Sequence, residues 1–275
     1  MNPHAAQPVS LLVMLSSLFG NRELIINMIR REVVGRYRGS IMGLLWSFIN
    51  PVFMLVVYSF VFSVVFMARW STVGENQVQF AVILFSGMTV HAFFAEIVNR
   101  SPAIVLNNVN YVKKVVFPLE ILAVVNLGVA LFHALISLFV LLMAFLVLNG
   151  FIYWTAIYLP LVLLPLIFIC LGFGWILSSL GVFVRDIGQF TGVLTSALMF
   201  LSPVFYPVSA LPNSLQVWIY LNPLTFFIEQ TREVLIWGHS PDWQGLAYYL
   251  IGAGFFAWLG YYWFQITRKG FADVV

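Results

Sequence analysis

The sequence predicts an all-α polytopic membrane protein with one membrane domain over residues 1–275. Hydrophobic residues make up 62% of the chain and charged residues 8%, whereas a soluble domain carries about 25% charged residues. An uncharged, mostly apolar run extends from Gly39 to Ala68, longer than the roughly 20 residues that a helix needs to cross the hydrocarbon core. Arginines precede this run, and such residues stay on the cytoplasmic side of a membrane.

The N-terminal 38 residues divide into a short apolar run and a basic helical stretch. The run from Val9 to Phe19 is too short to span and lacks the features of a cleaved signal peptide. From residue 21 to residue 38 the period is helical, and one face is apolar: Ile25, Ile26, Ile29, Val33 and Tyr37. The same stretch carries four arginines: Arg30, Arg31, Arg36 and Arg38. A basic amphipathic helix in the membrane interface is predicted, either as an anchor that sets topology or as an element that transmits force from a cytoplasmic partner.

Hydropathy predicts six transmembrane helices with both termini cytoplasmic. The spans are expected at 41–67, 78–98, 119–148, 154–183, 188–204 and 245–267. With the N-terminus inside, Arg69 and Arg232 are the only two of the 13 lysines and arginines that fall outside. The opposite orientation would invert this bias, so the positive-inside rule selects the first.

The cytoplasmic loop after the second span has helix signals of its own. Ser101 is a residue type that caps helices, and Pro102 suits a first helical position. A short helix across the cytoplasmic face is predicted over 101–112. The alternative is a solvated loop whose lysines contact lipid.

The stretch 203–235 is apolar and aromatic, yet four prolines interrupt it: Pro203, Pro207, Pro212 and Pro223. Irregular backbone at membrane depth requires shielding by protein or a water-filled cavity. Re-entrant helices that dip in from the outer side are therefore expected, with turns near Pro212 and at 222–223. Arg232 is spaced to pair with Glu229 at i,i+3.

Aromatic residues make up 17% of the chain. Most are expected to serve in packing or in interfacial belts. A minority could line a route for carbohydrate, because sugar C–H faces stack on aromatic rings. The candidates for such a channel are Tyr58, Phe62, Phe190 and Phe200.

The sequence lacks the residues that several kinds of chemistry require. No G-x-x-x-x-G-K-[ST] motif is present to cradle a triphosphate, so the chain is not expected to hydrolyse ATP or to be an enzyme. The four histidines are scattered, so no metal site is expected, and the single cysteine, Cys170, excludes an intrachain disulfide. The net charge of +3 is attributed to loops that face anionic lipid and not to nucleic acid.

Five blocks and the tail resemble the permease subunits of type-2 ABC exporters for polysaccharides, which export O-antigen, capsule or teichoic acid chains. The blocks follow one another in family order: RREVVGRYRGSIMGLLWSFINPVFMLVVYSFVF (30–62), NNVNYVKKVVFPLEIL (107–122), SSLGVFVRDIGQF (178–190), SPVFYPVSALP (202–212) and NPLTFFIEQTREVL (222–235). The tail RKGFADVV is similar to members that export O-antigen.

This resemblance implies a location in the bacterial inner membrane and a set of partners. Two permease chains would pair with two separate subunits that bind ATP and magnesium, and the cargo would be a glycan on a polyprenyl-diphosphate carrier. Residues 21–38 would be a gate helix. Residues 101–112 would be the coupling helix that docks on the ATPase, through Ser101, Ile104, Asn107, Asn108 and Tyr111. Residues 203–235 would close the outer mouth, with Phe205, Tyr206, Trp218, Tyr220, Glu229 and Arg232 as its gate residues.

Two classes of function remain after this comparison of motifs. The first is an export permease, with O-antigen as the expected cargo and capsule or teichoic acid as alternatives. The second is a membrane-embedded transferase of envelope lipid synthesis. A transferase would be expected to show an Asp/His constellation at the membrane, and the sequence has none.

Overall fold

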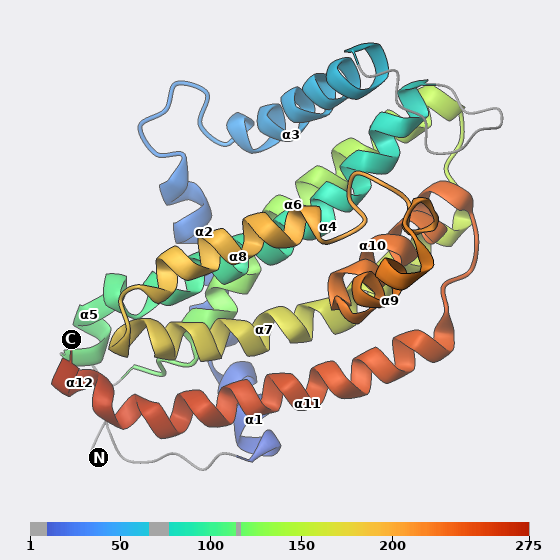
Figure 1. Ribbon diagram of the computed structural model, residues 1–275. Coiled ribbons are helices and arrows are strands. Elements are labelled where there is room, and N and C mark those ends of the chain that lie inside the picture. The colour runs from blue at the N-terminus through green and yellow to red at the C-terminus, as the bar shows by residue number, and fades with distance from the viewer. Residues whose placement is uncertain (1–9, 66–76, 114–116, 275) are drawn as a thin grey trace.

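The computed structural model describes residues 10–65, 77–113 and 117–274, and every regular element in these ranges is a helix. The long helices run side by side (Figure 1). Two short helices, α5 (Val109–Lys113) and α12 (Phe271–Val274), lie at one end of the molecule, which we call the coupling end. Two others, α9 (Asn213–Leu221) and α10 (Pro223–Arg232), lie toward the other end, the mouth end.

Six helices occupy the positions that hydropathy predicts for spans. They are α3 (Leu45–Tyr58) with its π-helical extension η1 (Ser59–Val65), α4 (Gln77–Ile104), α6 (Ile121–Asn149), η3 (Trp154–Tyr158) with α7 (Leu159–Phe183), α8 (Ile187–Phe200) and α11 (Trp243–Thr267). Four stretches of the described chain are long and apolar enough to cross a membrane: 45–62, 80–104, 121–149 and 154–183. Helix α8 has only 14 residues, and α11 is rich in tyrosine and tryptophan. The count of six spans therefore stays a prediction.

The N-terminal segment forms two helices that meet at Asn21 with a bend of 62°. Helix α1 spans Leu11–Gly20 and α2 spans Arg22–Arg36, the latter close to the predicted interfacial stretch. On α2, Ile25 and Val33 are buried, but Ile26 is 62% exposed. Ile26 lies about 100° around the helix from Ile25 and so does not share its packing. The interfacial position of the apolar face stays a prediction.

Helix α4 is the core of the molecule, and α3 is its periphery. Of the stretch 80–104, 78% is buried, against 6% of the stretch 45–62. Helix α4 packs against α3, α6, α7, α8 and α10, whereas α3 lies along one side of the bundle (Figure 1). A helix that is apolar on all sides can be buried in this way by its neighbours.

The helix predicted to begin at Ser101 does not begin there. Helix α4 continues to Ile104, with Pro102 inside it, and the Ser101 hydroxyl donates to the Ile97 carbonyl at 2.6 Å. Gly181 of α7 sits directly against the Pro102 carbonyl, where a side chain would collide. Tertiary packing therefore overrides the local start signal. The rest of the stretch forms a 3₁₀ turn, η2 (Leu106–Asn108), and then α5.

The proline-rich stretch folds into short helices whose breaks lie where the prolines predict them. After η4 (Val208–Ala210), Pro212 precedes α9 and Pro223 is the first residue of α10. The Asn222 side chain caps α10 by accepting from the Leu224 amide at 3.0 Å. A second π-helix, η5 (Glu233–Trp237), follows α10. Whether this stretch re-enters the membrane stays a prediction.

The chain ends in a short extension of α11. A 3₁₀ turn, η6 (Arg268–Gly270), leads from α11 into α12. Phe271 is fully buried there, so the C-terminal segment packs into the coupling end.

Candidate functional site

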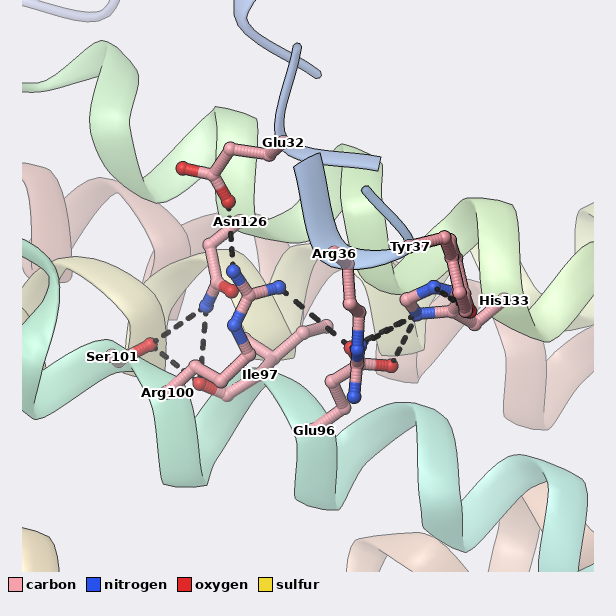
Figure 2. Close-up of polar contacts among 9 residues, drawn as sticks. All are labelled: Glu32, Arg36, Tyr37, Glu96, Ile97, Arg100, Ser101, Asn126 and His133. Carbon is pink, nitrogen blue, oxygen red and sulfur yellow. Dashed lines mark hydrogen bonds and ion pairs between the residues drawn. The ribbon is translucent and has the colours of Figure 1, made fainter. Parts of the chain in front are cut away.

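A network of charged side chains joins α2 to α4 and α6 (Figure 2). The Arg36 guanidinium lies 2.6 Å from the Glu96 carboxylate, and His133 Nδ1 lies 2.9 Å from the same carboxylate. One turn along α4, Arg100 lies 2.7 Å from Glu32 of α2 and 3.7 Å from Glu96. Glu96 is thus the acceptor that three helices share.

The network is partly solvated. The side chains of Glu96 and His133 are 18% and 17% exposed, while that of Arg36 is 52% exposed. The Tyr37 hydroxyl lies 3.3 Å from His133 Nε2, and burial raises the pKa of Tyr37, with Arg36 opposing and Glu96 adding to that shift. Single exposed ion pairs contribute roughly 0–1 kcal/mol, so the strength of this contact comes from the shared acceptor.

Sequence reasoning missed Glu96 and His133 as members of the site. The available signal was Glu96 and Arg100 at i,i+4 within an otherwise apolar helix, because charged groups in such a helix usually have a partner and a function.

The four arginines predicted for the interfacial helix divide into two groups. Arg36 belongs to the network, and both terminal nitrogens of Arg31 lie 3.2 Å from the Tyr111 hydroxyl of α5. Arg30 and Arg38 are exposed. The Arg31 contact connects α2 directly to the predicted coupling segment.

The predicted coupling residues do not share one surface. Ser101 is fully buried and accepts from the Asn126 amide at 3.3 Å, so its side chain faces α6 and not solvent. Asn108 donates to the Ile104 carbonyl at 2.8 Å and closes the end of α4. Asn107 is exposed. Of these residues, Asn107 is the best placed for docking a partner.

At the mouth end, three predicted aromatics from three segments form one stack. The ring centroid of Phe205 lies 6.0 Å from that of Phe62 of η1 and 5.5 Å from that of Phe200 of α8. The interplanar angle is 26° in both pairs. Phe80 of α4 extends the stack, 5.9 Å from Phe62. Offset ring pairs of this kind add about 0.5–1.5 kcal/mol each beyond the area that they bury.

Other predicted aromatics lie apart from this stack. Phe190 is at the opposite end of α8 and is 62% exposed, and Tyr58 packs with the residues around Val82 and Phe145. Trp218 and Tyr220 are 70% and 55% exposed. Both side chains face away from the packed interior of this chain, and their role as gate residues stays a prediction.

Arg232 is the central polar contact of the mouth end. It is 2% exposed, and it donates to the carbonyls of Ile83 at 3.2 Å, Pro203 at 2.6 Å and Val204 at 3.0 Å. Gly87 provides the room, since a Cβ there would lie 2.6 Å from the guanidinium. These bonds replace the predicted i,i+3 pair with Glu229, which acts on Arg232 through longer-range attraction.

Two of the three carbonyls that Arg232 binds, those of Pro203 and Val204, lie in the segment that follows α8. Helix α8 stops at Phe200, and Pro203 cannot continue the helical ladder. Asn222 supports the same break by donating to the Ser202 hydroxyl at 2.8 Å and to the Leu201 carbonyl at 3.2 Å. The guanidinium thus binds the broken end of α8 to α4 and α10.

A buried ion pair closes the coupling end. Glu120 and Arg268 are 1% and 7% exposed and lie 2.9 Å apart. Ser17 of α1 donates to Glu120 at 2.8 Å, and Arg268 also donates to the Phe117 carbonyl at 2.9 Å. This contact ties both terminal segments to the start of α6, and sequence reasoning did not foresee it. Among the residues that the structure describes, no His/Cys/Asp/Glu group could hold a metal ion.

Comparison with known proteins gives one family and several relatives. A family model described as ABC-2 type transporter matches residues 23–236. The O-antigen export system permease protein RfbA of Myxococcus xanthus is 25% identical over 264 residues, covering 95% of this chain and 99% of the relative. The polysialic acid transport protein KpsM of Escherichia coli is 27% identical over 79% of this chain and 83% of its own length. The capsule polysaccharide export inner-membrane protein CtrC of Neisseria meningitidis serogroup B is 28% identical over 78% and 80%.

Proposed function

The chain belongs to the ABC-2 type transporter family, and we propose that it is the membrane permease that exports a lipid-linked O-antigen polysaccharide across the bacterial inner membrane. The observation that carries the proposal is the match to an O-antigen export permease over nearly the full length of both chains. Permeases named for capsule and polysialic acid also match, so capsular polysaccharide is the second candidate cargo.

Within this proposal the permease does not hydrolyse ATP itself. Its sequence has no triphosphate-cradling loop, so ATP and magnesium would be bound by a separate subunit. We propose an assembly of two permease chains with two such subunits, in which each permease crosses the membrane six times with both termini cytoplasmic. The asymmetry of lysine and arginine supports this orientation.

The coupling end offers a route by which the partner could move the permease. An ATPase that docks at Asn107 would act on α5, and α5 contacts α2 through Tyr111 and Arg31. Helix α2 is joined to α4 by the pairs of Arg36 with Glu96 and of Glu32 with Arg100. A shift of α2 would therefore displace the coupling end of α4.

Helix α4 reaches from this network to the mouth. Its 28 residues correspond to about 40 Å of helix. Glu96 lies near one end and Ile83, whose carbonyl Arg232 binds, lies near the other. We propose that a tilt of α4 releases Arg232 and the aromatic stack, and that the mouth opens for the glycan. The stacked rings would then be available to the C–H faces of passing sugars.

The test is replacement of a known permease. The chain is expressed with its cognate ATPase in a strain that lacks its O-antigen export permease but synthesises the lipid-linked polymer. The proposal predicts O-antigen at the cell surface, and a parallel capsule-export mutant should stay uncapsulated. Capsule restored without O-antigen would establish the second cargo, and restoration of neither polymer with an assembled transporter would contradict both.

A further inference from the structure

An apolar pocket of about 460 Å³ lies between α7 and α11. Its walls include Ile169 and Phe173 of α7 and Tyr249, Gly252, Ala253 and Phe256 of α11. This volume is within the usual range for small-molecule sites, about 300–1,000 Å³. None of the functional residues discussed above lines it.

The pocket exists because α7 and α11 meet tightly at one level. A Cβ on Gly260 would lie 2.6 Å from the Gly172 carbonyl, so the two backbones nearly touch there. The Phe256 ring packs on Gly172 and lies 4.9 Å from the ring of Phe173. Gly172 lies between the lining residues Ile169 and Phe173, Gly260 lies beyond the lining residues of α11, and the pocket follows the mouth-end half of α11.

The chemistry of the pocket favours a hydrocarbon. No charged side chain lines it, and its polar atoms belong to two tyrosines. The neighbouring surface of α11 is also apolar, with Ile251 74% exposed and Phe255 58% exposed. With α11 as the sixth span of the proposed permease, we assign this exposed apolar surface to lipid, and the pocket is continuous with it. A polar ligand would find no partner there.

We propose that this pocket binds one acyl chain of a membrane phospholipid, and that the bound chain supports the mouth segment in its closed state. The proposal rests on the proposed function, because it assumes that α7 and α11 stand in a bilayer. It adds a lipid to the components that control the mouth.

The link to the mouth is direct. Pro223, the first residue of α10, lines the pocket. The Tyr249 ring stacks on Phe226 of α10 at 4.4 Å and meets Phe227 at 5.2 Å. The same helix carries Arg232 at its other end. An acyl chain in the pocket would therefore contact Pro223 and Tyr249, the residues through which the pocket meets α10.

Phospholipid is the occupant that these residues fit, in preference to the carrier lipid. Phospholipid is the bulk hydrocarbon that α7 and α11 would meet. A site for the carrier would be expected to offer cationic groups to its diphosphate, and no such group lines this pocket.

Two glycines of α11 provide a matched pair of variants. Gly252 lines the pocket, Gly254 does not, and a Cβ at either position meets no atom within 4 Å. Gly252→Phe is designed to place a ring in the pocket, and Gly254→Phe adds the same ring to the same helix outside it. Both proteins should assemble with their ATPase partner.

The experiment uses the whole transporter in nanodiscs that contain phosphatidylethanolamine with a photoreactive group in one acyl chain. After illumination, peptides covering 248–256 should carry the label. Gly252→Phe should reduce that labelling by about tenfold, because the ring takes the volume of the chain, while Gly254→Phe should leave it unchanged.

Three outcomes would overturn the inference. The first is equal labelling in both variants, which would indicate ordinary lipid contact. The second is strong preference for a photoreactive polyprenyl phosphate, which would assign the pocket to the carrier. The third is a crosslink from Ala253 to a second permease chain. Labelling requires no export, so a negative labelling result would not contradict the proposed function. In the same way, a negative O-antigen assay would not contradict lipid binding in the pocket.

Discussion

The two ends of α4 are held by different kinds of contact. At the coupling end, Glu96 and Arg100 form ion pairs with side chains that are between 17% and 52% exposed. At the mouth end, the Ile83 carbonyl accepts from the Arg232 guanidinium, which is 2% exposed, and Gly87 leaves room for that guanidinium. Solvated pairs exchange partners at low cost, whereas buried polar contacts are costly to leave unmade. The contact between α2 and α4 should therefore be the less costly of the two to rearrange, and the contact of Arg232 with α4 the more costly.

Of the substitutions proposed here, removal of Arg232 should have the largest effect on stability and on closure of the mouth end. Arg232→Met leaves the carbonyls of Pro203 and Val204 without this donor, while Ile83 still accepts from the Ser86 hydroxyl. Each unsatisfied buried group costs about 1–3 kcal/mol. We expect a lower unfolding temperature and a raised ion leak in proteoliposomes without ATP.

Arg232→Lys serves as the graded control. A lysine keeps the charge but cannot present the planar fork that reaches several carbonyls, so its leak should lie between those of the native protein and Arg232→Met. A leak that is the same in all three proteins would show that the guanidinium does not hold the mouth.

The aromatic stack should give the second largest effect. Phe205→Ala removes the ring between Phe62 and Phe200, at a cost of roughly 2 kcal/mol for a half-buried ring. Idle leak should rise less than in Arg232→Met, and export should fall. Trp218→Ala, which removes a ring that is 70% exposed, is the control and should seal normally. Equal leak from both variants would argue against the stack as the seal.

A charge at the coupling end should change function with almost no effect on stability. Asn107 is exposed, and a surface substitution of this kind usually stays within about 0.5 kcal/mol. Asn107→Asp should lower export severalfold while the ATPase subunits still turn over ATP. Ser101→Ala is the comparison variant. Because Ser101 is buried, this substitution should affect folding more than coupling. Normal export by Asn107→Asp would remove this residue from the docking surface.

Hydropathy and proline positions predicted the places of the helices because these signals are local. The apolar runs became α3, α4, α6, α7, α8 and α11, and helices break at Pro212 and Pro223. Local signals failed at Ser101, where packing of Gly181 against Pro102 carried α4 onward.

The polar contacts of the site could not be predicted in the same way. Arg232 binds Ile83, which is 149 positions away, and Glu120 binds Arg268 across 148 positions. The partner that helical spacing indicated for Arg232 was Glu229. Backbone carbonyls carry no side-chain signature, so only the fold could identify them as its acceptors. The rings of the stack were predicted in two separate roles, Phe62 and Phe200 for the channel and Phe205 for the outer gate, and their contact was not predicted.

The central claim is that movement of α2 reaches the mouth through α4, and accessibility of Val204 tests it most directly. Val204 is fully buried beside Arg232, and Cys170, the one native cysteine, is buried as well. In a Val204→Cys transporter, reaction with a membrane-impermeant maleimide from the outer side should be slow at rest and faster during ATP turnover. Adding Glu96→Gln, which weakens the shared acceptor, should abolish the acceleration while hydrolysis continues. Acceleration that survives Glu96→Gln unchanged would contradict the claim.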